Sequence, residues 1–182
     1  MDLILWRHAE AEEGEPDATR ALTPKGRRQA MKVAGWLDRN LPSGCRILCS
    51  PARRTVQTAD TLGRKYRIHA DLAVDSTPER ILQLVNWPSG REPVLVVGHQ
   101  PVLGQLAALL VHGVEADWTV RKGAVWWIAQ RERDDFGDIL TAAGVPDIPV
   151  QESTERKKWS EGEEFNASTF DYEQYEQDFL KK

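Results

Sequence analysis

Residues 3–10 read Leu-Ile-Leu-Trp-Arg-His-Ala-Glu, an apolar run that ends in Arg7 and His8. Such a run is typical of a central strand that is covered on both faces. In an open α/β sheet the last residues of a buried strand lie at the rim, where these folds bind their ligands. Arg7 offers a planar fork of donors suited to a phosphoryl or carboxylate group, and a neutral His8 nitrogen is able to attack phosphorus. The stretch predicts a buried strand that delivers binding and chemistry to one place.

Two further apolar segments end in the same kinds of side chain. The sequence Ser-Pro-Ala-Arg-Arg-Thr-Val-Gln-Thr at 50–58 follows the apolar segment 45–49, and Gly-His-Gln-Pro at 98–101 follows residues 94–97. An arginine beside a histidine is weak evidence alone, because a strand-end histidine is more often a hydrogen-bonded structural residue. Three strand ends carrying Arg, His, Arg and His indicate a shared site.

Strand and helix patterns alternate along the chain. We expect strands at 2–7, 45–49, 94–97 and 123–129, and helices at 24–40, 50–65, 77–87 and 101–111. Thr-Pro at 23–24 and 77–78, and Ser-Pro at 50–51, have the form of an N-cap followed by the first helical residue. This alternation predicts a layered α/β domain with a largely parallel sheet.

The composition changes near residue 130. Residues 1–130 hold 17 Lys and Arg against 14 Asp and Glu, whereas residues 131–182 hold 7 against 14. We therefore expect one domain at 1–130 and an acidic C-terminal extension at 131–182 that is partly helical or mobile. Within it we expect a short helix at 134–143, a loop at 145–164 and an aromatic-faced helix. That last helix, with Tyr172, Tyr175 and Phe179 on one face, would pack on its own domain or bind a partner.

Several classes of protein are disfavoured. No run of 18 or more apolar residues and no signal peptide is present, so we expect a cytoplasmic protein without membrane association. The mildly basic body lacks the dense basic stripe of nucleic-acid binding. Cys45 and Cys49 lie about 13 Å apart on one strand, too far for a disulfide. The histidines show no short metal-ligand spacing, so we expect no metal; they are His8, His69, His99 and His112.

The four strand-end side chains suit phosphoryl transfer. Arg7 and an arginine of the second segment, Arg53 or Arg54, could hold phosphoryl oxygens by charge-assisted hydrogen bonds and stabilise the transition state. One ring nitrogen of His8 could attack if the other donates its proton to an acceptor that fixes the tautomer. His99 could donate to a phosphoryl oxygen or act in proton transfer. Glu10 is expected to be a structural acceptor that orients its neighbours.

The three segments together resemble the signatures of the histidine phosphatase, or phosphoglycerate mutase-like, superfamily. Arg-Ala-Leu-Thr-Pro-Lys-Gly at 20–26 further resembles the SixA-type phosphohistidine phosphatases. The resemblance spans roughly residues 1–130 and implies a three-layer α/β/α sandwich that needs no cofactor. It implies that His8 is the phosphorylated nucleophile, and it selects Arg54 over Arg53. The resemblance also implies that the catalytic residues are Arg7, His8, Arg54 and His99. Of these, Arg7, Arg54 and His99 would bind the phosphate, with Arg20 as a further candidate for phosphate binding.

The sequence departs from the family pattern in two places. Ala9 stands where the family usually has glycine after the histidine, so the backbone there must tolerate a methyl group. Residues 131–182 match nothing in the resemblance, and family members of this type usually end much sooner.

The choice of substrate depends on a general acid. Ester hydrolysis expels a poor alkoxide, which general acid catalysis typically helps by about 10²–10⁴-fold. Asp71, Asp75 and Glu79 lie where mutase-like relatives place a carboxylate, but in no matching pattern. A phosphoramidate needs less assistance, because imidazole can leave protonated. We therefore expect a phosphatase acting on phosphohistidine in a protein, such as a phosphocarrier or histidine-kinase type domain, and releasing inorganic phosphate. The alternatives are a phosphomonoesterase for small phosphate esters and a non-catalytic module that binds phosphoproteins.

Overall fold

The computed structural model describes residues 1–131 and 139–144, which all belong to one compact unit. The sheet has the order β3-β2-β4-β1-β5-β6. Its strands are β1 (Asp2–Arg7), β2 (Arg46–Cys49), β3 (Arg67–Ile68), β4 (Val94–Gly98), β5 (Val125–Arg131) and β6 (Ile139–Gly144). The neighbours among β3, β2, β4 and β1 are parallel, while β5 and β6 are antiparallel. The expected largely parallel sheet is confirmed.

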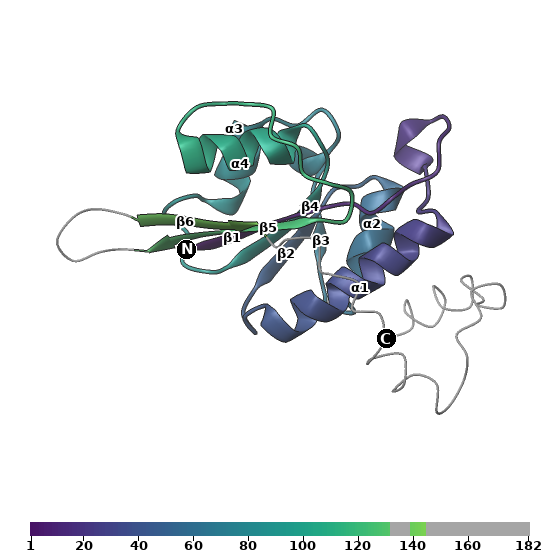
Figure 1. Cartoon of the computed structure of the whole chain (residues 1–182), viewed down its shortest axis with the longest axis horizontal. Helices are drawn as coiled ribbons and strands as arrows, with labels where there is room; N and C mark the ends of the chain where they lie inside the picture. The colour runs from purple at the N-terminus through teal and green to yellow at the C-terminus, as the bar shows by residue number, and fades with distance from the viewer. Residues whose placement is uncertain (132–138, 145–182) are drawn as a thin grey trace. The chain divides into compact units, whose positions relative to one another are not determined.

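Helices cover both faces of this sheet (Figure 1). They are α1 (Pro24–Asn40), α2 (Arg53–Asp60), α3 (Pro78–Val85) and α4 (Val102–His112), with short 3₁₀ helices η1 (Asp17–Thr19) and η2 (Ala70–Leu72). Side chains of β1 alternate between the two faces, as the pleat requires. Ile4 and Trp6 pack with α1 and α2, whereas Leu3 and Leu5 pack with α3 and α4. The fold is therefore the three-layer α/β/α sandwich that the resemblance implies.

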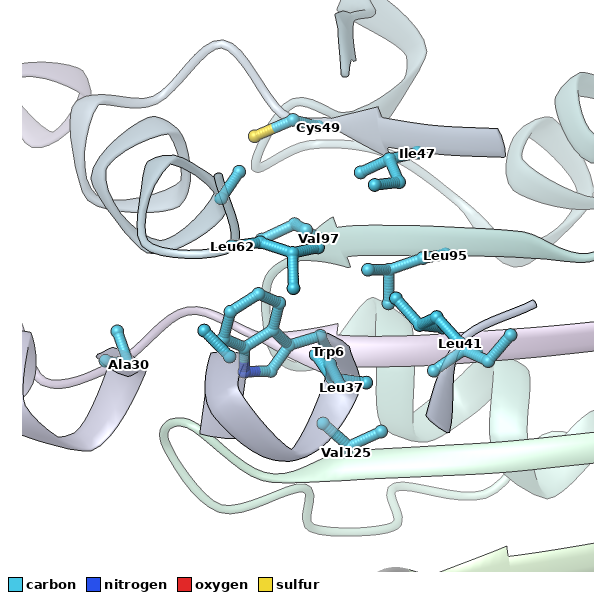
Figure 2. Packing of buried hydrophobic residues seen from close by; sticks show 14 of the residues in the cluster. Trp6, Ala30, Leu37, Leu41, Ile47, Cys49, Leu62, Leu95, Val97 and Val125 are labelled. Carbon is cyan, nitrogen blue, oxygen red and sulfur yellow. The ribbon is translucent and has the colours of Figure 1, made fainter. Parts of the chain in front are cut away.

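The core on the α1 side is centred on the indole of Trp6 (Figure 2). Trp6 is fully buried, and its Nε1 donates to the carbonyl oxygen of Gly123 at 3.2 Å, so the polar edge of the ring is also paired. Leu37 of α1 and Val97 of β4 lie in the same cluster. This packing fixes β1, whose next two residues are Arg7 and His8.

Two of the three expected N-caps are formed. The hydroxyl oxygen of Thr23 accepts from the backbone N–H of Gly26, and that of Thr77 accepts from the N–H of Arg80. The third expectation is wrong: α2 begins at Arg53 with Ala52 as its N-cap, ends at Asp60, and has no side-chain cap. The hydroxyl of Ser50 is fully buried and bonds His99 instead, because an unpaired buried hydroxyl is costly.

The helix expected at 134–143 is wrong for residues 139–143, and its residues 134–138 lie outside the described part of the chain. Ile139–Gly144 is strand β6, which pairs antiparallel with β5 from Arg131 opposite Ile139 to Trp126 opposite Gly144. The backbone ladder along the open side of β5, with β-branched residues on β6, outweighs the modest helix preference of the alanines. The sheet therefore continues past residue 130, where the composition changes. The loop expected at 145–164 and the aromatic-faced helix lie outside the described residues.

Two glycines allow backbone segments to cross close to helices near the strand ends. A Cβ on Gly26 of α1 would lie 1.9 Å from the carbonyl oxygen of Glu10, and one on Gly104 of α4 would lie 1.7 Å from that of Trp118. No side chain fits in either place. The loop that follows His8 and the segment that precedes β5 are thus held directly against helix backbones.

Both cysteines are free thiols. Burial raises the pKa of Cys49 to about 12 and that of Cys45 to about 11, so both are unreactive thiols at neutral pH. Within residues 1–131 and 139–144, no helix combines the length and apolar character needed to cross a membrane.

Candidate active site

The carboxyl ends of three parallel strands meet at one edge of the sheet. Arg7 at the end of β1 lies opposite Gly98 at the end of β4, and Cys49 of β2 lies opposite Val97. The next residues along each strand are His8, His99 and Ser50. The strand register therefore brings together side chains that are about 40 to 90 positions apart in the sequence, as expected for the ligand edge of such a sheet.

His8 is held in one tautomer. Its Nδ1 lies 2.7 Å from the carbonyl oxygen of Ala9, which only accepts, so Nδ1 carries the proton. Its Nε2 therefore has the lone pair, and it accepts from Nε of Arg54 at 3.2 Å. This is the orientation that a nucleophilic histidine needs, with one nitrogen fixed by the backbone and the other directed at the cationic side of the site.

Burial keeps this imidazole neutral. Only 6% of His8 is exposed, and burial is the main reason why its pKa falls to about 4; the positive charges of Arg54, Arg7 and Arg20 lower it further, against the hydrogen bond to Ala9. A neutral ring at physiological pH keeps an electron pair on Nε2 for attack, which in the free protein accepts the hydrogen bond from Nε of Arg54 and is released when phosphorus approaches.

His99 lies beside His8, with the two ring centroids 5.3 Å apart. Its Nδ1 is 3.3 Å from Nη2 of Arg54, a group that only donates, and its Nε2 is 2.6 Å from the hydroxyl of Ser50. Nε2 therefore donates to Ser50 in the neutral form. Burial first, and then the neighbouring His8 and Arg54, lower the pKa of His99 to about 3.

Arg54 points inward, whereas Arg53 is exposed, as the resemblance implies. Besides its contacts with both histidines, Arg54 donates from Nη1 to the backbone oxygen of Asp17 at 2.6 Å and from Nη2 to Oδ2 of Asp17 at 2.8 Å. Its side chain is only 3% exposed, so nearly the whole cation is enclosed by protein. The α2 backbone that carries Arg54 also supports the loop after His8, because Thr58 bonds both the Arg54 carbonyl and the Ala9 N–H.

Arg7 is anchored by the segment that precedes β5. Its Nη1 donates to the backbone oxygen of Val120 at 2.6 Å, and its buried Nε has no hydrogen-bond partner. The side chain of Gln100 holds the accepting segment in place, donating to the Trp118 oxygen at 2.5 Å and accepting from the Val120 N–H at 3.4 Å. A buried donor without an acceptor is uncommon and costly, and an anion bound at this edge would satisfy it.

Arg20 and Glu10 belong to the loop above the site. Arg20 donates from Nε and Nη2 to Oδ1 of Asp17, at 2.9 and 2.6 Å, and from Nη1 to the Glu12 oxygen at 2.9 Å. The Asp17 carboxylate therefore lies between Arg20 and Arg54 and accepts hydrogen bonds from both. Glu10 accepts from Thr23 at 3.0 Å and from Lys25 at 2.9 Å, the structural role expected of it.

The three carboxylates considered as general acids are all exposed. Asp71 lies 3.4 Å from Nδ1 of His69, and hydrogen bonds with its own backbone and with Thr77 lower the pKa of Glu79. Asp75 follows the short helix η2. Among the contacts of the described residues, none joins Asp71, Asp75 or Glu79 to His8. In the same part of the chain, no group of three or more His, Cys, Asp or Glu side chains is arranged to hold a metal ion.

Sequence reasoning missed three residues of this site: Asp17, Ser50 and Gln100. The spacing of Asp17 and Arg20 allows an i,i+3 ion pair and could have indicated that contact. Ser50 and Gln100 directly flank residues already assigned to the site, but their partners lie on other elements.

Comparison with known proteins identifies the family of the chain. The sequence model described as the histidine phosphatase superfamily (branch 1) matches residues 3–78. An uncharacterized protein of Mycobacterium tuberculosis strain H37Rv is 34% identical over 116 residues, which cover 60% of this chain and 73% of that protein. The phosphohistidine phosphatase SixA of Escherichia coli strain K12 is 30% identical over 122 residues, covering 62% of this chain and 76% of SixA.

Solved structures share the fold. The protein histidine phosphatase SixA complexed with tungstate superposes with a TM-score of 0.63 at 24% identity, covering 79% of this chain and 97% of that one. A mycobacterial glucosyl-3-phosphoglycerate phosphatase superposes with a TM-score of 0.61 at 18% identity, covering 79% and 97%. The sequence relatives align over about three quarters of their length, and the fold is the expected sandwich. The chain therefore belongs to the histidine phosphatase superfamily and is, by that membership, a phosphatase.

Proposed function

We propose that this phosphatase removes the phosphoryl group from a phosphohistidine of another protein, through a phosphohistidine intermediate at His8. The observation that carries the proposal is the neutral His8 ring, fixed by Ala9 at Nδ1, with the Nε2 lone pair directed at the Arg54 guanidinium. A nucleophile beside a cation that can hold phosphoryl oxygens is the arrangement that phosphoryl transfer requires.

The reaction has two steps. Nε2 of His8 attacks phosphorus, a P–N bond to His8 forms, and the P–N bond of the substrate breaks as its imidazole leaves with a proton from solvent. Arg7 and Arg54 bind the phosphoryl oxygens, and the orphan Nε of Arg7 gains an acceptor. Water then attacks phosphorus, the bond to His8 breaks, and inorganic phosphate is released. In the free protein Nδ1 of neutral His99 lies against Nη2 of Arg54. The negative charge of a bound phosphoryl group raises the pKa of His99, and the protonated Nδ1 then donates to a phosphoryl oxygen.

Arg20 acts on this site in two ways. Its positive charge is among the influences that lower the pKa of His8, and its guanidinium binds the Asp17 carboxylate that contacts Arg54. We therefore assign Arg20 to the wall of the phosphate site.

Two considerations favour phosphohistidine over a phosphate ester. The carboxylates Asp71, Asp75 and Glu79 are exposed and have no described contact with His8, so none of the three stands beside the nucleophile as a general acid for an alkoxide leaving group. The similarity to SixA of Escherichia coli points the same way. Small esters remain the second candidate, because the same fold occurs in the glucosyl-3-phosphoglycerate phosphatase.

The test uses the full chain and a phosphocarrier protein labelled with radioactive phosphate on histidine. We expect release of inorganic phosphate and, after rapid quenching, an acid-labile phosphoenzyme. The His8→Asn variant should lose both, while His69→Asn, the same change at a partly exposed histidine outside the site, should keep both. Full activity of His8→Asn would refute the nucleophile, and binding of the phosphocarrier without turnover by the unaltered chain would favour a binding module.

A parallel measurement separates the two substrate classes. The value of kcat/KM is compared for the phosphocarrier and for small esters such as phosphoserine. A preference for the phosphocarrier supports the proposal, whereas faster hydrolysis of an ester would replace it with the second candidate.

A further inference from the structure

Every nitrogen of the Arg54 guanidinium has a partner within the free protein. Nε donates to His8, while Nη1 and Nη2 both donate to Asp17, one to its backbone oxygen and one to its carboxylate. Asp17 lies on η1, in the loop between β1 and α1, and its side chain is 43% exposed against 3% for Arg54. A carboxylate from an outer loop therefore covers a buried cation of the active site.

This carboxylate takes the place that a phosphoryl group needs. An arginine binds carboxylate and phosphate through the same planar fork of donors. The phosphoryl group attacked by Nε2 of His8 has to lie next to Arg54, whose Nη2 donates to the Asp17 carboxylate at 2.8 Å while Nη1 donates to the Asp17 backbone oxygen at 2.6 Å. A second anion at the same donors would also be repelled by the carboxylate. Asp17 and a phosphoryl group therefore exclude each other at Arg54.

The surroundings of Asp17 allow it to leave. Residues 12–16 are exposed, and η1 has no side-chain cap, so the loop can shift without opening the core. Arg20 binds the other carboxylate oxygen, Oδ1, and is itself attached to the backbone of Glu12. Arg20 thus provides a second partner that retains Asp17 at the edge of the site after Arg54 is released.

We propose that Asp17 is a specificity-determining residue: its carboxylate is an internal competitor that a phosphoryl group must replace at Arg54. The proposal rests on the proposed function, since it concerns the anion that the same site binds. The displaced carboxylate stays near the bound phosphoryl group and disfavours substrates with another anionic group close to phosphorus. A phosphoryl group on an uncharged imidazole avoids this repulsion.

The test measures the affinity for inorganic phosphate by calorimetry. Asp17→Asn keeps the shape of the side chain and removes its charge, while Glu13→Gln removes one charge from an exposed position of the same loop. We expect phosphate to bind about tenfold more tightly to Asp17→Asn, a change of about 1.4 kcal/mol in binding free energy. Glu13→Gln should change the affinity for phosphate far less. Unchanged or weaker binding by Asp17→Asn would overturn the competitor role, and an equal gain in Glu13→Gln would reduce it to a general charge effect.

The selection between substrates is tested by measuring the affinity of the same variants for phosphoserine and for phosphoramidate. Phosphoserine carries a carboxylate near its phosphoryl group and phosphoramidate does not, so the gain in affinity on Asp17→Asn should be larger for phosphoserine. Equal gains for the two ligands would refute the selection against a second anion.

The outcomes also separate this inference from the proposed function. Suppose that Arg54→Gln abolishes phosphate binding and that Asp17→Asn leaves the affinity unchanged. In that case the competitor role fails and the phosphatase site stands. If Asp17→Asn tightens phosphate binding but the phosphocarrier is not hydrolysed, the competitor role stands and the phosphohistidine substrate fails.

Discussion

The hydroxyl of Ser50 lies 2.6 Å from Nε2 of His99, and both groups are buried. Ser50 follows β2 and His99 follows β4, so this bond ties two neighbouring strand ends at the floor of the site. It also gives the His99 ring a defined orientation, with Nδ1 toward Arg54.

Replacing Ser50 by alanine should therefore affect stability and catalysis together. The Nε2–H of His99 loses its acceptor in a buried place, which costs about 1–3 kcal/mol. We expect a lower midpoint of urea unfolding and a lower kcat/KM for the phosphocarrier. Ser43→Ala, at an exposed position before β2, is the control that should change neither. Wild-type stability and activity in Ser50→Ala would contradict a role for the bond.

The two buried histidines should make the folded protein sensitive to acid. Their pKa values in the fold, about 4 for His8 and about 3 for His99, lie below the ordinary 6.5, so between these values the unfolded chain binds more protons. The contribution of the two histidines to the free energy of unfolding is then fully present above about pH 6.5. It is lost as the pH is lowered, by up to about 1.4 kcal/mol per pH unit for each histidine. Urea unfolding from pH 7 to 4 should show a shallower loss in a His8→Gln, His99→Gln double variant. An unchanged slope would contradict the depressed pKa values, and a His69→Gln, His112→Gln variant controls for histidine content.

Two glycines of α1 should respond to alanine in opposite directions. A Cβ on Gly26 would lie 1.9 Å from the Glu10 oxygen, whereas one on Gly35 would have its nearest neighbour at 3.9 Å. Gly26→Ala forces the loop after His8 away from the helix, and we expect a loss of about 1–3 kcal/mol together with reduced activity. Gly35→Ala should stabilise the helix by about 0.5–1 kcal/mol, with activity unchanged. Equal responses in thermal unfolding would disprove the close approach.

Gln100 should act as a positioning residue for Arg7. Its side chain holds the segment at Trp118 and Val120, and the Val120 oxygen accepts from Arg7. Gln100→Ala frees that segment, so phosphate should bind several-fold more weakly, with KM changed more than kcat. Gln105→Ala is the matched control, because Gln105 bonds Asp117 of the same segment at an exposed position. A loss in kcat alone would point to a direct role in the chemistry instead.

The sequence contained enough information for the strands and helices that depend on local patterns. The run from Leu3 to Trp6 and the caps at Thr23 and Thr77 are local features, and the structure agrees with them. The order of the motifs also placed His8, Arg54 and His99 at one edge, because parallel strands align their carboxyl ends.

Contacts between distant segments could not be predicted in this way. The contact of Asp17 with Arg54 joins a loop to a helix 37 positions away, and no local pattern connects them. The sequence predicts a helix where β6 forms, since the pairing of β6 with β5, which no local pattern shows, decides its conformation. The hydroxyl of Ser50 occupies a position typical of a cap, yet a buried ring nitrogen of His99 is its partner.

The strand that carries Arg7 and His8 has consequences for how the chain folds during synthesis. β1 has β4 and β5 as its neighbours, with Leu3 opposite both Val94 and Ile128. It precedes these partners by about 90 and 125 positions in the chain, and closing such long loops is slow. A ribosome-bound chain therefore presents a fully apolar, unpaired strand until β4 emerges. We expect release of active enzyme to depend on protection of residues 3–6 during that interval.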